Sequence, residues 1–101
     1  MDTLYGMVGR FEAQPGQGDA LAAVLVAAGE GLRSNDECFL YLVNRAPDNP
    51  DLVYVMEAWK SREAHDQSLR DPGAQEAIGR ARSLIVGISA TEMRPEGGKG
   101  I

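Results

Sequence analysis

Three side chains that can take part in chemistry lie close together in the segment 57–65. Glu57 carries a carboxylate, Trp59 is the only tryptophan and His65 is the only histidine of the 101 residues. Carboxylates and imidazoles can accept or donate a proton, and an indole offers a flat apolar face with one polar edge. We therefore expect a small-molecule site here, with His65 and Trp59 as its catalytic pair.

Three further residues are expected to line the same site. Glu57 shares one strand face with Trp59 by the period of two, and Tyr41 and Asn44 come from the preceding apolar segment. We assign Glu57, Tyr41 and Asn44 to substrate binding. Tyr41 would add an aromatic wall, and the Asn44 amide would orient a carbonyl or a phenol.

Each of these residues also has a purely structural interpretation. A single histidine often lies at a helix end, and a tryptophan often fills a core or an interface. Glu57 on an apolar face either borders a pocket or is paired with a cation, for which the chain offers Arg10, Arg45, Arg80 and Arg82.

The elements that would position the site are a strand and a helix joined almost without a loop. Leu52–Trp59 is rich in β-branched and aromatic residues, which is typical of a strand. Ser61 stands where a helix N-cap would, with Glu63 in the first turn, and predicts a helix from Arg62 to about Leu69. This helix would fold His65 back over the end of the strand. The expected pocket lies between the sheet and the helices 62–69 and 72–85.

The remaining elements follow from periodicity and breaker residues. We predict strands at 4–13, 37–45 and 89–94, a turn at 14–18, a loose loop at 46–51, and two further helices. Asp19 is the expected N-cap of a helix that ends near residues 33–35. Asp71 and Pro72 begin the last helix, which we expect to reach Ile85 and to end at Gly87.

The resulting order, βαββαβ, is that of an α+β ferredoxin-like domain with a four-stranded antiparallel sheet. We expect one domain over residues 1–96 and a flexible tail at 97–101. Helices cover only one face of such a sheet, yet both faces of the strand 37–45 are apolar. We therefore expect the other face to be covered by a second subunit in a homodimer, or by an apolar ligand.

Composition argues against several classes of partner. The balance of 15 acidic and 10 basic residues gives a net charge of −5, without a basic cluster for nucleic acid or an anionic membrane. We find no apolar run of membrane-spanning length and no signal peptide, and Cys38 stands alone. A cytoplasmic protein is the expectation.

No metal, haem, flavin or nicotinamide cofactor is expected. One histidine, one cysteine and scattered acids give no ligand spacing typical of a metal site. The stretch Gly6-Met7-Val8-Gly9 matches half of a dinucleotide-binding loop, but no third glycine at a helix start follows.

The segment Glu57-Ala58-Trp59, followed by Ser61-x-Glu63-Ala64-His65, Ser68-Leu69 and Asp71-Pro72, resembles the antibiotic biosynthesis monooxygenase family, including its quinol monooxygenases. The opening strand, the Pro15-Gly16 turn, the acidic loop 48–51 and the glycine-rich tail fit the same resemblance, which spans nearly the whole chain. The resemblance implies a dimeric α+β barrel and a pocket between sheet and helices. It also implies oxidation of a phenolic or hydroquinone substrate by O₂ without cofactor.

The chain departs from the family pattern at two points. Many relatives carry a histidine three positions later, where this chain has Ser68. Haem-degrading relatives have an asparagine in the first strand, which is absent here. Two functions therefore stay open: a cofactor-independent monooxygenase acting on a small aromatic, and a non-catalytic small-molecule-binding or stress-related dimer.

Overall fold

The computed structural model describes residues 3–101, in which four strands and three helices follow the expected order. They are β1 (Tyr5–Ala13), α1 (Gly18–Glu30), β2 (Cys38–Ala46), β3 (Asn49–Trp59), α2 (Arg62–Ser68), α3 (Pro72–Arg82) and β4 (Ile85–Met93). The predicted α+β ferredoxin-like fold is confirmed, with α2 and α3 together forming the second helical connection.

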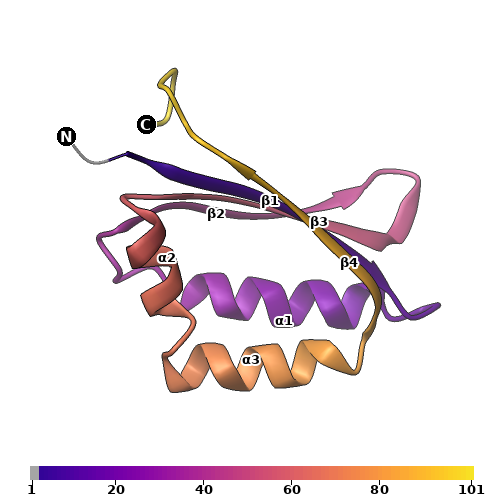
Figure 1. Ribbon diagram of the computed structural model, residues 1–101. Helices are drawn as coiled ribbons and strands as arrows, with labels where there is room; N and C mark the ends of the chain where they lie inside the picture. The colour runs from indigo at the N-terminus through magenta and orange to yellow at the C-terminus, as the bar shows by residue number, and fades with distance from the viewer. Residues whose placement is uncertain (1–2) are drawn as a thin grey trace.

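The sheet is antiparallel with the strand order β2-β3-β1-β4, and the helices lie together on one side of it (Figure 1). β3 is a central strand, paired with β1 and with β2. Tyr5 is the partner of Trp59 in β1, and Tyr41 is the partner of Glu57 in β2. Residues that could take part in chemistry thus come from three strands and meet at one end of the sheet.

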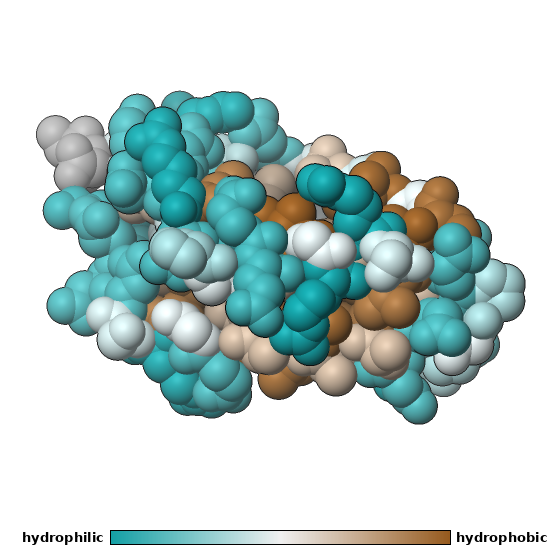
Figure 2. Space-filling view, turned by 90° about the horizontal axis from the view of Figure 1, so that it is seen from below, coloured by the Kyte–Doolittle hydropathy of each residue, from teal (hydrophilic) through white to brown (hydrophobic). Residues whose placement is uncertain are grey.

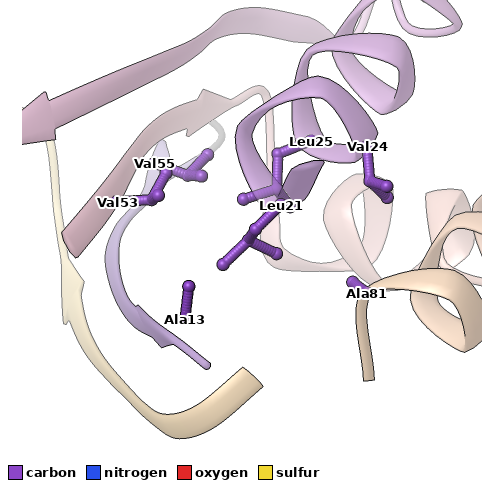
Figure 3. Packing of buried hydrophobic residues seen from close by; sticks show 7 residues of the cluster. All are labelled: Ala13, Leu21, Val24, Leu25, Val53, Val55 and Ala81. Carbon is purple, nitrogen blue, oxygen red and sulfur yellow. The ribbon is translucent and has the colours of Figure 1, made fainter. Parts of the chain in front are cut away.

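The main core lies between the sheet and α1. Val53 and Val55 lie two residues apart in β3, so both side chains point toward the helices. They pack there against Leu21, Val24 and Leu25 of α1 (Figure 3). Ala13 from β1 and Ala81 from α3 complete the cluster. Since each buried valine or leucine side chain stabilises the fold by about 1.5–3 kcal/mol, this cluster holds the helices on the sheet.

The sheet face away from the helices is apolar and uncovered. Leu40, Leu42, Met56 and Met93 are between 37% and 48% exposed. On the opposite side, seen from below in Figure 2, hydrophilic residues cover much of the helices, with hydrophobic residues between them. The homodimer predicted from the two apolar faces stays a prediction.

The start of α1 differs from the prediction. Asp19 lies inside the helix, and Gln17 occupies the N-cap position without a side-chain hydrogen bond. The Asp51 carboxylate instead accepts hydrogen bonds from the Gly16 and Gly18 amides, at 3.0 and 2.9 Å. A Cβ on Gly18 would lie 1.9 Å from the Pro50 carbonyl oxygen, so this contact requires a glycine.

Three predicted boundaries were also wrong. The β2–β3 connection is tighter than expected, since Ala46 pairs with Asn49. α1 ends at Glu30, before Gly31, and α3 ends at Arg82. Ile85 already belongs to β4, where it pairs with Ala13. An apolar stripe that continues from a helix into a strand gives no sign of the change in period.

Candidate functional site

The site is built where β3 passes into α2, and the local sequence explains the sharp turn. Ser61 has an extended backbone, and its hydroxyl accepts a hydrogen bond from the Ala64 amide at 3.1 Å, as the N-cap prediction required. α2 therefore begins three residues after Trp59. His65 is in the first turns of this helix and is buried with 8% exposure.

Glu57, Trp59 and His65 lie in contact with one another, as the sequence predicted. The Trp59 indole Nε1 donates a hydrogen bond to Oε1 of Glu57 at 3.0 Å. Nε2 of His65 is 4.0 Å from the same oxygen. The imidazole meets the indole in an edge-on arrangement with ring centroids 5.6 Å apart. The Glu57 and His65 side chains are only 11% and 10% exposed.

Two further neighbours of His65 had not been assigned to the site from the sequence. Nδ1 of His65 lies 3.0 Å from Oδ1 of Asp66, and the Tyr5 ring lies 5.0 Å from the imidazole, centroid to centroid. The imidazole therefore has a carboxylate on each nitrogen side and an aromatic ring on each of two flanks. Tyr5 could have been found from the pairing of the first and third strands, whereas the Asp66 contact depends on a side-chain rotamer.

Tyr5 links the site to β4 and to the start of α2. Its hydroxyl donates a hydrogen bond to Oε2 of Glu92 at 2.6 Å, and Arg62 lies 2.9 Å from the same carboxylate oxygen. The Arg62 guanidinium also lies over the Tyr5 ring, 5.4 Å from its centroid. Burial, and then the hydrogen bond to Glu92, raise the pKa of Tyr5 to about 12.

The surroundings of Glu57 raise the pKa of its carboxyl above the ordinary glutamate value. Burial raises the pKa of the Glu57 carboxyl, and this effect outweighs the hydrogen bond from Trp59 and the attraction of His65, which lower it. A buried carboxyl of raised pKa is a candidate for proton transfer to or from a substrate. None of the four arginines considered for Glu57 forms an ion pair with it among residues 3–101, and Arg45 instead pairs with Asp19.

Tyr41 reaches this group but Asn44 does not. Tyr41 is the cross-strand partner of Glu57, and burial together with the Glu57 charge raises the pKa of its hydroxyl. Asn44 pairs with Tyr54, on the sheet face away from the helices, and its amide donates to the Leu42 carbonyl. The structure therefore does not bring Asn44 to the other four residues.

Cys38 is brought to the site by an irregularity in β2. A shift of register between Cys38 and Leu40 makes Cys38 the partner of Trp59, and both pack in a small cluster with Tyr5 and Ala64. Strict alternation had placed Cys38 on the opposite face from Tyr41. Burial, and then the charge of Glu57, raise the pKa of the Cys38 thiol.

The hollows of the surface are not where we expected the pocket. A groove of about 520 Å³ runs between α1 and β2, and includes Gly29, Cys38 and Tyr41 in its lining. A smaller, more polar hollow of about 300 Å³ lies beside α2, lined by Ala64, Ser68 and residues of the 35–37 loop. Neither is enclosed between the sheet and α3, because Ala81 and the α1 side chains fill that space.

Two further observations concern the described chain, residues 3–101. No three histidine, cysteine, aspartate or glutamate side chains are grouped there as a metal site would require. The helices are all too short or too polar to cross a bilayer.

Comparison with known proteins agrees with the fold. The family model described as "Antibiotic biosynthesis monooxygenase" matches residues 4–80. A Chloroflexus aurantiacus J-10-fl crystal structure, described as a "putative Antibiotic biosynthesis monooxygenase", is 42% identical with a TM-score of 0.88. That match covers 98% of this chain and 99% of the other. No curated protein matches the sequence.

More distant structures share the fold. A Caulobacter crescentus CB15 protein with the same description is 15% identical, with a TM-score of 0.86 over 95% of this chain and 92% of its own. A Mycobacterium tuberculosis protein is 22% identical, with a TM-score of 0.84 over 96% and 99%. Since the family model covers most of the chain, and the Chloroflexus protein aligns over nearly its full length, the chain belongs to the antibiotic biosynthesis monooxygenase family.

Proposed function

We propose that this protein is a cofactor-independent monooxygenase that oxidises a small phenolic or hydroquinone-type aromatic with O₂. Membership of the family supports the reaction class. The observation that carries the proposal is the buried pair of Glu57 and His65, 4.0 Å apart, with aromatic rings beside it. An electron-rich phenolate can itself reduce O₂, so the protein has only to remove a proton, orient the ring and exclude water.

The reaction balances without an external reductant. The base removes the phenolic proton, and the resulting anion has carbanion character at the ring carbons ortho and para to the oxygen; the reacting carbon is one of these that carries a hydrogen. This carbon transfers electrons to O₂ and forms a C–O bond, giving a peroxide that takes up a proton. Loss of the C–H proton from that carbon and cleavage of the O–O bond then yield a quinone carbonyl and water. One oxygen atom of O₂ enters the product and the other leaves as water.

The geometry favours Glu57 as the group that first receives the proton and His65 as its partner. Both imidazole nitrogens face carboxylates, whereas the Glu57 carboxyl has an Oε2 atom that makes neither the Trp59 nor the His65 contact. This modifies the role expected from sequence, in which His65 met the substrate directly. Trp59 holds Oε1 in place, and Tyr41 flanks the carboxyl from the next strand.

Oxygen uptake with a panel of hydroquinones and anthrones tests the proposal. Chelator-treated, colourless protein should consume O₂, and His65→Ala should lower the rate by about 10²–10⁴-fold, as loss of a general base does. Leu69→Ala, at the exposed C-cap position just after α2, serves as the matched control and should keep the wild-type rate. No uptake above the spontaneous rate on any of these substrates would contradict the proposal.

A further inference from the structure

The groove between α1 and β2 has the size of a ligand site. Its volume of about 520 Å³ lies within the range of small-molecule pockets, roughly 300–1,000 Å³. Its lining on the helix-facing side includes Val26 and Gly29 of α1 and Tyr41 and Val43 of β2. The charged side chains of Glu30 and Arg33, and residues of β2 that face the other side of the sheet, also border it. Because β2 is the edge strand of the sheet, the groove opens at the side of the molecule.

The inner wall of this groove separates it from the acid–base pair. Tyr41 and Cys38 line the groove, and their cross-strand partners are Glu57 and Trp59. Neighbouring strands lie about 4.8 Å apart, so the Glu57 carboxyl stands one strand inward from the wall, on the same face. The influence of the Glu57 charge on the pKa of both Tyr41 and Cys38 is consistent with this closeness.

The Tyr41 ring lies directly on the backbone of α1, at a glycine. A Cβ added to Gly29 would be 2.8 Å from Cδ1 of Tyr41, which is closer than real Cβ atoms approach. A glycine inside a helix is less favourable than alanine, so the clearance for the Tyr41 ring has an energetic cost. Among residues 3–101 the Tyr41 hydroxyl makes no hydrogen bond with another side chain or the backbone, which leaves it available to a ligand.

We propose that the α1–β2 groove is the binding subsite and entrance for a planar aromatic phenol, and that Tyr41, seated on Gly29, is the gate between this groove and Glu57. The inference rests on the proposed function for the identity of the ligand class. Displacement of the Tyr41 ring would join the groove to the buried carboxyl. Val26, Val43 and the Tyr41 ring would hold the substrate ring, and the phenolic hydroxyl would point inward to the base.

The groove is tested by binding, without turnover. Val26 is 47% exposed and lines the groove, whereas the next residue, Ala27, is exposed on the same helix but does not line it. Calorimetric titration with 1,4-naphthohydroquinone under argon should show saturable binding to the wild type. Val26→Lys should raise the Kd at least tenfold, and Ala27→Lys should leave it within twofold.

The gate is tested with a second matched pair. Gly29→Ala pushes against the Tyr41 ring, while Gly79→Ala is made in the interior of α3, where a Cβ meets nothing within 4 Å. Gly29→Ala should change the Kd by fivefold or more, and Gly79→Ala should not. Circular dichroism of both variants confirms that the fold is kept.

The outcomes separate this inference from the proposed function. Absence of saturable binding to the wild type, or equal affinities of Val26→Lys and Ala27→Lys, contradicts the proposal that the groove binds the phenol. Oxygen uptake with an unchanged KM in Val26→Lys also overturns it, while the proposed function stands. Binding that is lost in Val26→Lys, in a protein that consumes no O₂, supports the groove and contradicts the proposed function.

Discussion

At the scale of single residues, the decisive contact is the one between the Glu57 carboxyl and the His65 imidazole. The two groups are buried and 4.0 Å apart, and burial raises the pKa of Glu57. The raised pKa makes the Glu57 carboxylate a stronger base for a phenolic proton than an ordinary glutamate.

The raised pKa of Glu57 predicts a pH dependence of stability. Between the ordinary glutamate pKa, about 4.3, and the raised value, the folded state binds more protons than the unfolded state. The contribution of this carboxyl is therefore fully present below the unfolded pKa and is lost as pH rises through the folded pKa. Glu57→Gln has no proton to lose at this position, so its stability does not fall in this way as pH rises. Its amide oxygen can still accept the hydrogen bond from Trp59.

Urea unfolding of the wild type and of Glu57→Gln from pH 4 to pH 8 measures the effect. The stability of the variant relative to the wild type should increase as pH rises. Glu63→Gln, at an exposed position on α2, is the control and should show no such trend. A difference between Glu57→Gln and wild type that is constant with pH would contradict the assignment.

The sequence was sufficient to predict part of this site. The period of two along the third strand, followed by a cap, brings Glu57, Trp59 and His65 together through local rules. Asp66 could not be predicted in the same way, because its contact depends on a side-chain orientation. Strict alternation along the strand 37–45 puts Cys38 on the face opposite Tyr41, which is wrong because a bulge breaks the alternation, and the sequence carries no clear sign of that bulge.

At the scale of elements, the N-cap at Ser61 sets the direction of α2 and so the position of His65. α2 has only seven residues and would be marginal alone, so its cap and its contact with β3 determine its stability. Boundaries marked by caps, such as Ser61 and Asp71, were predicted well. The end of α3 was not, because Leu84 and Ile85 continue the apolar pattern although the chain has already left the helix.

Removal of the cap hydroxyl should therefore affect both stability and activity. Ser61→Ala is expected to destabilise the protein by about 1 kcal/mol, within the range for lost N-caps, and to reduce oxygen uptake by loosening His65. Chemical denaturation and the oxygen electrode measure the two effects. Ser34→Ala, at an exposed position between α1 and β2, is the control. Equal stabilities of the two variants would show that the cap does not hold α2.

At the scale of the whole molecule, the uncovered sheet face governs assembly. Leu40, Leu42, Met56 and Met93 together form an exposed apolar surface on the side away from the helices. Surfaces of this kind on small domains commonly form interfaces. We propose that two copies pack through these faces into a homodimer, with an interface above about 1,000 Å², beyond the area of most crystal contacts.

Light scattering at micromolar concentration should give the mass of a dimer. Leu42→Glu, in the centre of β2, should shift the population to monomer because an unpaired carboxylate would be buried in the interface. Leu69→Glu changes an exposed leucine outside the sheet and should leave the dimer intact. A wild-type monomer, or equal effects of the two substitutions, would contradict the proposed interface.

The central claim, that the Glu57–His65 pair enables direct reaction of a phenol with O₂, is tested most directly by isotope labelling. Chelator-treated wild type and Glu57→Gln are each supplied with ¹⁸O₂ and with the hydroquinone or anthrone that gives the highest oxygen uptake. Mass spectrometry then measures the ¹⁸O content of the product. The account predicts one ¹⁸O atom per product molecule for the wild type, and a rate about 10²–10⁴-fold lower for Glu57→Gln. Equal rates of the two proteins, or a product without ¹⁸O, would contradict it.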